Sequence, residues 1–172
     1  LVTGIAQANA AFSPVISLAG AIATEHEGKD AFQEIDQQAL FETITKKTWS
    51  IKQTNKIPEI LNEAFNLALT PRCGPVHVNL PRDVLANSDS FAKFKKIKKA
   101  TNPVASKENI SKAIDIILSS SQPVIIAGGG IKNTQAHEEV VKLAKILNIP
   151  IVSSAGHGDA IPFNENLYAG QM

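Results

Sequence analysis

Two glycine-rich stretches are the first candidate binding sites in this sequence. One consists of Gly128, Gly129 and Gly130, which follow the apolar residues 123–127, and the other begins with Ser154, Ala155 and Gly156. A glycine turn between a strand and a helix lets the backbone approach a phosphate group, and the helix N-terminus supplies N–H donors. The dinucleotide fingerprint GxGxxG is not met, because Asn133 stands at its last position and no acidic side chain follows about 20 residues later. A standard NAD site is therefore disfavoured, while a nucleotide contact and a purely structural turn both stay open.

A polar loop is the second candidate. Residues 30–36 combine four polar groups with one aromatic side chain, Phe32. Loops held on a rigid scaffold often carry binding and catalytic residues. The alternative is a structural role, in which Asp36 caps the helix that follows.

Two arginines are the third candidate, because they flank an apolar segment at residues 75–80. Arg72 precedes this segment and Arg82 follows it. Guanidinium groups at the two ends of one strand could hold two anionic groups. The alternative is that both are surface side chains, with Arg82 paired locally to Asp83, a contact that contributes little.

The histidines and the single cysteine do not indicate a metal site. His26 lies between two glutamates, but neighbouring residues do not share a face, so three-ligand binding is not expected there. Cys73 is the one cysteine, which excludes a CxxC site and an internal disulfide. His157 and Asp159 follow the second glycine-rich stretch and are either ligands or catalysts, or ordinary turn residues. His137, beside two glutamates on an expected helix, is expected to be solvated.

The elements that must position these residues alternate between helices and strands. Apolar side chains recur with helical spacing over residues 57–68, 110–118 and 136–147, and less regularly over 36–43, while residues 2–11 resemble the middle of a helix. Strands are expected at residues 14–19, 75–80, 123–127 and 150–153, with a weaker one at 48–52. Three of the strands are nearly all apolar, which predicts burial on both faces. The fold class is therefore α/β, with parallel sheets flanked by helices in two partial units.

Composition excludes several classes of protein. The chain has 172 residues, of which 44% are hydrophobic and 19% charged, too apolar for a disordered protein. Its apolar runs are too short to span a membrane, no secretory leader is evident, and a net charge of +1 does not call for a nucleic-acid partner. Residues 1–91 carry a net charge of −3 and residues 92–172 a net charge of +4. The change falls at a lysine run that favours a solvated linker over a nucleic-acid patch: Lys93, Lys95, Lys96, Lys98 and Lys99.

Four segments together resemble the acetohydroxyacid (acetolactate) synthase group of thiamine diphosphate-dependent enzymes. They read VTGIAQANAAFSPVISLAG, DAFQEIDQQALFETITKKTW, AFNLALTPRCGPVHVNLPRDV and PVIIAGGGI, and they cover almost the whole chain in order. The resemblance implies that residues 1–85 are the C-terminal half of a pyrimidine-binding domain. Residues 86–102 would be a lysine-rich linker, and residues 103–172 the start of a Rossmann-like central domain that holds FAD in synthases of this group. Both ends of the chain are accordingly expected to continue into a longer protein.

The resemblance also implies roles for individual residues. Phe32 and Gln33 match positions that face the substrate and the reactive part of the cofactor across a subunit interface. Arg82 matches a position that is lysine in the synthases proper. Matches to flavin-contacting positions are Arg72, Gly128, Gly129, Gly130, Ser154, Ala155, Gly156, Gln171 and Met172.

The resemblance implies a carboligase or decarboxylase that acts on 2-keto acids in the cytoplasm, as a homodimer or homotetramer. Thiamine diphosphate and Mg²⁺ would be its cofactors, but the activating glutamate would lie before residue 1 and the metal anchor after Met172. The chain alone is thus expected to be inactive and to hold no metal, and no membrane or nucleic-acid partner is expected.

Departures from the synthase pattern at Arg82 and at residues 155–158 leave other enzymes open. These are the sulfoacetaldehyde acetyltransferase, glyoxylate carboligase and oxalyl-CoA decarboxylase types, some of which hold ADP or no flavin. From another class, a non-catalytic nucleotide-binding α/β module stays open, and an RNA-binding protein that uses the lysine run ranks last.

Overall fold

The computed structural model describes residues 1–91, 97 and 103–172. The chain forms two compact units, Leu1–Pro103 (unit 1) and Val104–Met172 (unit 2). All five members of the lysine run, and most of the linker expected at 86–102, lie outside the described residues.

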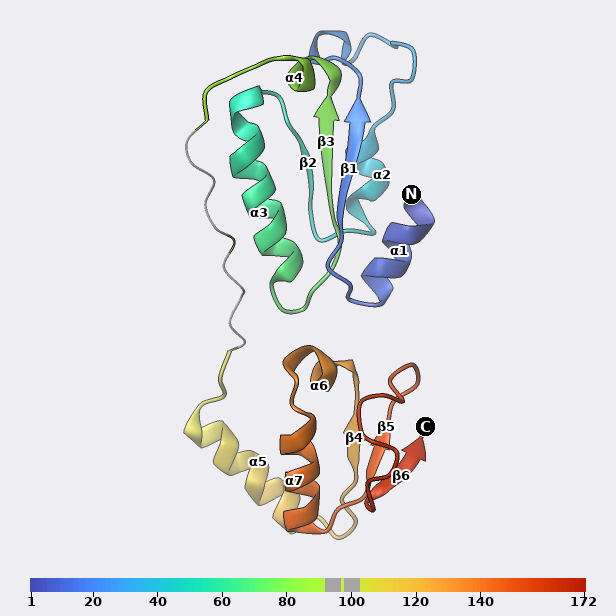
Figure 1. The fold of residues 1–172 in the computed structure, drawn as a ribbon, viewed down its shortest axis with the longest axis vertical. Helices are drawn as coiled ribbons and strands as arrows, with labels where there is room; N and C mark the ends of the chain where they lie inside the picture. The colour runs from blue at the N-terminus through green and yellow to red at the C-terminus, as the bar shows by residue number, and fades with distance from the viewer. Residues whose placement is uncertain (92–96, 98–102) are drawn as a thin grey trace. The chain divides into compact units, whose positions relative to one another are not determined.

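Unit 1 is built on a three-stranded parallel sheet (Figure 1). Its strands are β1 (Ile16–Ala21), β2 (Thr48–Ser50) and β3 (Val76–Pro81), in the order β1-β3-β2. In register, Ile16 of β1 lies opposite Val76 of β3. The helices are α1 (Val2–Ala10), α2 (Gln37–Glu42), α3 (Ile57–Leu69) and α4 (Arg82–Ala86), with two 3₁₀ turns, η1 (Thr24–His26) and η2 (Thr54–Lys56).

Helices α3 and α2 cover opposite faces of β3. Val76 and Val78 are buried in one cluster with Ala64 and Ala68 of α3. Because successive side chains of a strand point to opposite faces, His77 faces the other way, where its ring stacks on Phe41 of α2 at 3.9 Å. The central strand is thus buried on both faces.

The α2 face of the sheet holds a buried polar chain. The Nδ1 atom of His77 lies 2.9 Å from Ser17 Oγ, and its Nε2 atom lies 2.7 Å from Asn79 Oδ1. A neutral imidazole that accepts from the serine hydroxyl and donates to the asparagine satisfies all three groups. Burial lowers the pKa of His77, since a charged ring would lose its hydration there.

Unit 2 is a second three-stranded parallel sheet, in the order β4-β5-β6 (Figure 1). Its strands are β4 (Ile125–Ala127), β5 (Ile151–Ser153) and β6 (Tyr168–Gln171), and its helices are α5 (Lys107–Ser119), α6 (Gly129–Thr134) and α7 (His137–Leu147). Ala144 of α7 is fully buried against Ala127 and Ile151. Helix α7 therefore covers one face of this sheet.

The expected helices and strands are confirmed, with bounds that shift by a few residues. Asp36 caps α2 by accepting from the N–H of Ala39 at 3.0 Å. Helix α4, helix α6 and strand β6 carry no periodic apolar pattern, because each is only four to six residues long.

Two expectations about burial are wrong. Leu18 of β1 is 52% exposed and Ile126 of β4 is 58% exposed, and each of these strands lies at the edge of its sheet. His137 is not solvated: it is half-buried, and its Nδ1 atom lies 2.7 Å from the carbonyl oxygen of Ala160.

Among the described residues, no helix combines the length and the apolarity needed to cross a membrane. In the same part of the chain, no three histidine, cysteine, aspartate or glutamate side chains are placed to hold a metal ion together.

Candidate functional site

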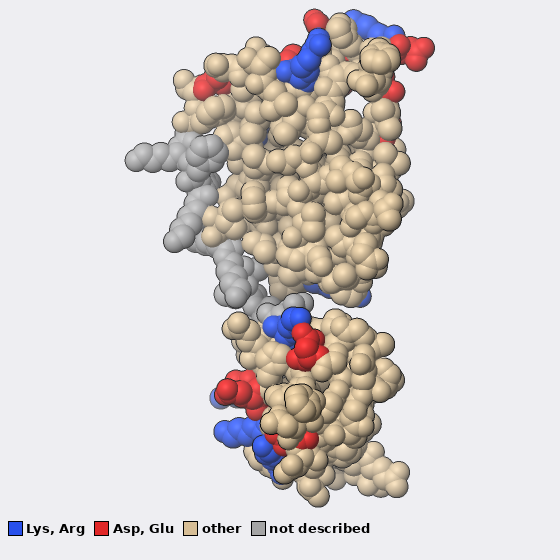
Figure 2. All heavy atoms as spheres, turned by 45° about the vertical axis from the view of Figure 1, so that its right-hand side comes forward, with Lys and Arg blue, Asp and Glu red and all other residues tan. Residues whose placement is uncertain are grey.

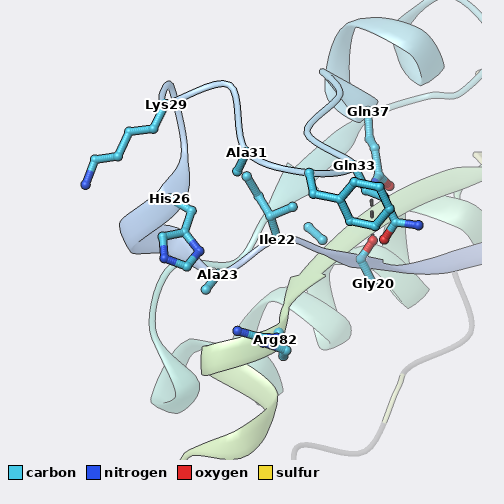
Figure 3. Close-up of a pocket in the computed structure, with 11 residues that line it drawn as sticks. Gly20, Ile22, Ala23, His26, Lys29, Ala31, Gln33, Gln37 and Arg82 are labelled. Carbon is cyan, nitrogen blue, oxygen red and sulfur yellow. Dashed lines mark hydrogen bonds between the residues drawn. The ribbon is translucent and has the colours of Figure 1, made fainter.

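A pocket of about 880 Å³ opens at the carboxyl ends of β1 and β3 in unit 1 (Figure 3). Ligands of open parallel sheets bind at this edge. Residues 20–23 and Ala31 supply small or apolar walls, and the larger side chains are His26, Lys29, Phe32, Gln33, Gln37 and Arg82. In Figure 3, His26 and Lys29 lie on one side of the pocket, Gln33 and Gln37 on the other, and Arg82 below them.

The loop between η1 and α2 places Phe32 and Gln33 in the pocket. Its backbone turns sharply, with φ values of +75° at Gly28 and +66° at Gln33. Glu34 holds the turn, because its carboxylate accepts from the N–H groups of Gly28 at 2.5 Å and Ala31 at 3.0 Å. These hydrogen bonds favour the ionised form and lower the pKa of Glu34. The Phe32 side chain stays 88% exposed, so it has room to contact a ligand.

Strand β3 places Arg82, because α4 begins at the residue after the strand ends. The next residue, Asp83, accepts from both the N–H and the hydroxyl of Thr24, at 3.0 and 2.5 Å. The Thr24 bonds lower the pKa of Asp83, and they tie η1 to the start of α4. The carboxylate of Asp83 therefore binds Thr24, 59 residues away in the sequence, and not its neighbour Arg82, which was one interpretation of the sequence.

The structure thus brings Phe32, Gln33 and Arg82 into one pocket, although Arg82 is about 50 residues away along the chain. Sequence reasoning did not identify His26, Lys29 or Gln37 as pocket residues. Gln37 donates from Nε2 to the carbonyl oxygen of Gly20 at 2.9 Å, which links α2 to the end of β1. One feature of the sequence could have identified these three residues. All of them follow β1, at the carboxyl edge of the sheet where ligands bind.

Arg72 does not join this pocket. It precedes β3, whereas Arg82 follows it, so the two arginines lie at opposite ends of one strand. The guanidinium carbon of Arg72 lies 3.8 Å from the centre of the Phe12 ring, an ordinary cation–π contact. In unit 1 this residue is thus held on an aromatic face at the amino end of the sheet.

Unit 2 brings its own candidates together at the carboxyl edge of its sheet. Gly128 follows β4, Ser154 follows β5, and Gln171 and Met172 end the chain at β6. The Met172 N–H donates to Ser153 at 2.9 Å, and the Gln171 side chain reaches the Ser154 carbonyl oxygen at 3.5 Å. Gly129, Gly130, Ala155 and Gly156 complete this edge.

The glycines at this edge differ in what surrounds them. A Cβ at Gly129 would lie 2.6 Å from Cε1 of His157, so the imidazole rests on the glycine backbone. Nothing lies within 4 Å of a Cβ at Gly130, or at Gly156, whose φ is +78°. The backbone of these two glycines is therefore open on the side where a Cβ would stand. Asp159 is not free to bind a ligand, because Lys132 pairs with it at 2.5 Å and lowers its pKa.

Comparison with known proteins places this geometry in context. Residues 110–172 match the family described as thiamine pyrophosphate enzyme, central domain. The chain is 39% identical over its whole length to a "Probable acetolactate synthase large subunit" of Methanococcus aeolicus, and 40% identical to one of Methanocaldococcus jannaschii. It spans about 30% of the length of these curated relatives.

A solved structure shares the fold. It was assigned to a thiamin diphosphate-dependent enzyme isolated from Mycobacterium smegmatis. The two match with a TM-score of 0.85 at 21% identity, over 99% of this chain and 33% of the other. The likeness at this identity concerns the fold alone.

Proposed function

The chain belongs to the thiamine pyrophosphate-dependent enzymes, and on that premise we propose that it is part of a carboligase or decarboxylase of 2-keto acids. The acetolactate synthase large subunits are 39% and 40% identical over the whole chain, whereas a glyoxylate carboligase of Escherichia coli O157:H7 is 28% identical over the same span, which favours acetolactate formation over that alternative. Residues 1–85 are proposed as half of the pyrimidine-binding domain, 86–102 as a linker, and 103–172 as the start of the central domain.

One observation carries the proposal: a single pocket holds an exposed aromatic ring, an amide and a guanidinium. Phe32, Gln33 and Arg82 line it together. Arg82 offers a planar pair of donors that matches a substrate carboxylate. Gln33 donates or accepts a hydrogen bond at the reacting carbonyl, and Phe32 packs on the carbon skeleton and excludes water.

Thiamine pyrophosphate supplies the chemistry that these side chains lack, because it turns the carbonyl carbon of a keto acid into a nucleophile. Residues 20–23 form a wall of small and apolar groups, against which the neutral pyrimidine ring of the cofactor would pack. This chain contributes binding and orientation: Arg82 fixes the carboxylate end, and Gln33 fixes the carbonyl oxygen. Mg²⁺ is proposed as the second cofactor, held by residues outside this chain.

FAD or ADP is proposed at the carboxyl edge of unit 2. Gly128, Gly129, Gly130, Ser154, Ala155, Gly156, Gln171 and Met172 would hold it, and Arg72 is proposed as a further contact. The open backbone at Gly130 and Gly156 supports this assignment.

A cytoplasmic homodimer or homotetramer is proposed as the working form. Figure 2 shows a broad face of unit 1 with almost no Lys, Arg, Asp or Glu between its two ends. Exposed apolar side chains in unit 1 include Val2 of α1 and Leu18 of β1. An uncharged surface of this kind supports burial against a second copy.

Steady-state kinetics on the complete enzyme that contains this chain tests the proposal. With thiamine diphosphate and Mg²⁺ present, pyruvate should be consumed and acetolactate formed. Gln33→Ala and Arg82→Ala should each lower kcat/KM by roughly 10- to 100-fold, while Lys112→Gln, on the surface of α5, should not. Turnover of glyoxylate, sulfoacetaldehyde or oxalyl-CoA in place of pyruvate would assign one of the related reactions. No turnover of any of them, with no binding of thiamine diphosphate, would refute the proposal.

A further inference from the structure

The role proposed for Arg82 requires a guanidinium group that no other anion occupies. In the described part of the chain, no carboxylate forms an ion pair with this side chain, which is exposed and lines the pocket (Figure 3). The next residue, Asp83, nevertheless carries a carboxylate, and opposite charges within about 4–6 Å of each other interact strongly. Whether Arg82 is free therefore depends on what holds Asp83.

Thr24 binds both oxygen atoms of the Asp83 carboxylate. Its N–H donates to Oδ1 at 3.0 Å, and its hydroxyl group donates to Oδ2 at 2.5 Å. These bonds favour the ionised form and lower the pKa of Asp83, so the carboxylate keeps its negative charge. Both donors belong to a residue 59 positions earlier in the chain, at the start of η1. The carboxylate is thus held toward η1 and is not paired with the neighbouring guanidinium.

Helix α4, which begins with Arg82, is also held by contacts that do not involve Thr24. The side chain of Val84 is 3% exposed and belongs to the hydrophobic core of unit 1. The carbonyl oxygen of Val84 accepts from Oγ1 of Thr54 at 2.8 Å. Loss of the Thr24 hydroxyl group should therefore free one carboxylate oxygen while the helix stays in place.

We propose that Thr24 keeps Arg82 available to the substrate, by holding the carboxylate of Asp83 away from the neighbouring guanidinium group. This inference rests on the proposed function, in which Arg82 binds the carboxylate of the 2-keto acid. Without the Thr24 hydroxyl group, Oδ2 of Asp83 turns to Arg82 and competes with the substrate for the same N–H donors. Thr24 does not line the pocket itself, so it is a positioning residue that acts through Asp83.

Steady-state kinetics on the complete enzyme, with pyruvate as the substrate, tests this role. Thr24→Val keeps the shape of the side chain and the N–H bond to Asp83 but removes the hydroxyl bond. It should raise KM by roughly 3- to 5-fold with kcat nearly unchanged, since the competing pair is a weak surface ion pair. Thr24→Ser keeps the hydroxyl group and should retain the original KM. The matched control is Thr54→Val, which removes a different hydroxyl bond to α4 and should not change KM.

The double variant Thr24→Val/Asp83→Asn distinguishes competition at Arg82 from a loosened helix. Asparagine has no negative charge to compete with the substrate, so KM should return to the original value. If the Thr24 hydroxyl group only stiffens α4, the double variant should keep the raised KM.

A measurement on the 172-residue chain separates this inference from the proposed function, because it needs neither cofactor nor turnover. The chain has only two arginines, Arg72 and Arg82, so an Arg72→Lys variant assigns both Nε–H signals in a nuclear magnetic resonance spectrum. The Nε–H of Arg82 should exchange its hydrogen at least about 2-fold more slowly in Thr24→Val, because an ion pair with Asp83 protects it. In the double variant, exchange should return to the original rate.

The possible outcomes are distinct. Slower exchange at Arg82 without any turnover of keto acids would keep the role of Thr24 toward Arg82 and refute the proposed function alone. Turnover with the same KM before and after Thr24→Val would overturn the inference alone. Unchanged exchange at Arg82, or a KM that Thr24→Val and Thr54→Val raise equally, would also overturn the inference.

Discussion

The imidazole ring of His157 lies against the backbone of Gly129, a contact that the absence of a Cβ at residue 129 allows. A Cβ at residue 129 would approach Cε1 of His157 to 2.6 Å, whereas one at Gly130, the next residue of α6, would meet nothing within 4 Å. The packing of the His157 ring thus gives residue 129 a reason to be glycine, whereas it gives residue 130 none.

Gly129→Ala should destabilise unit 2, because the added methyl group displaces the His157 ring. We expect a loss of about 1 kcal/mol in the free energy of unfolding, at the low end for overpacking because a side chain can move aside. Gly130→Ala should be neutral or slightly stabilising, since alanine favours a helix and the space is open. Tyr168 is the one tyrosine and lies in β6, so its spectroscopic signal reports on unit 2.

The double variant Gly129→Ala/His157→Ala supplies the control for this contact. Removal of the ring should recover most of the stability lost in Gly129→Ala. Equal stabilities for the Gly129 and Gly130 variants would show that the His157 contact costs nothing to disturb.

Unit 1 should lose stability as the pH falls below the ordinary histidine pKa of about 6.5. Burial lowers the pKa of His77 in the folded state, so the unfolded chain takes up a proton that the folded chain does not. The stability that depends on this difference is present above pH 6.5 and is lost below it, by at most about 1.4 kcal/mol per pH unit for one proton. Trp49, the one tryptophan, is buried in unit 1, and its fluorescence follows the transition.

His77→Gln separates this effect from the other histidines. The variant should be less stable at pH 7, because the hydrogen bonds to Ser17 and Asn79 are disturbed. Its free energy of unfolding should nevertheless depend less on pH between 7 and 5. An unchanged pH slope in the variant would rule out His77 as the group responsible.

Asp83→Ala should release η1 from the start of α4. The two hydrogen bonds from Thr24 to the carboxylate would both be lost. We expect the Thr24 amide to exchange its hydrogen at least about 10-fold faster, measured by nuclear magnetic resonance. Asp89→Ala, which removes an exposed carboxylate with only a neighbouring backbone contact, is the matched control. If the Thr24 amide stays equally protected from hydrogen exchange in Asp83→Ala, the hydrogen bonds to Asp83 do not hold η1 to the start of α4.

Arg82→Lys should raise KM for the keto acid by about 10-fold in the complete enzyme, with a smaller effect on kcat. Lysine keeps the positive charge but loses the planar pair of donors that matches a carboxylate. Steady-state kinetics across substrate concentrations measures both constants, with Lys56→Arg on the surface of unit 1 as the control. An unchanged KM would mean that a point charge at this position is enough.

Local sequence was sufficient to predict most elements of this fold. The apolar spacing from Ile57 to Ala68 predicts α3, and Asp36 caps α2, as one of the two interpretations of its loop predicts. Such features depend on residues within a few positions of one another. Burial of edge strands was not predictable in this way: whether Leu18 or Ile126 is covered depends on where a distant helix packs.

The candidate residues Phe32, Gln33 and Arg82 could be identified from the sequence, but their meeting in one pocket could not be derived from spacing. Parallel pairing of β1 with β3 brings the loop after one strand next to the helix after the other. The same pairing places Ser17 beside His77 and buries the polar chain of Ser17, His77 and Asn79, which short-range spacing does not predict. The positions of helices and strands follow from short-range periodicity in the sequence. The pocket and the buried histidine depend on contacts between residues about 50 to 60 positions apart, and only folding of the chain brings such residues together.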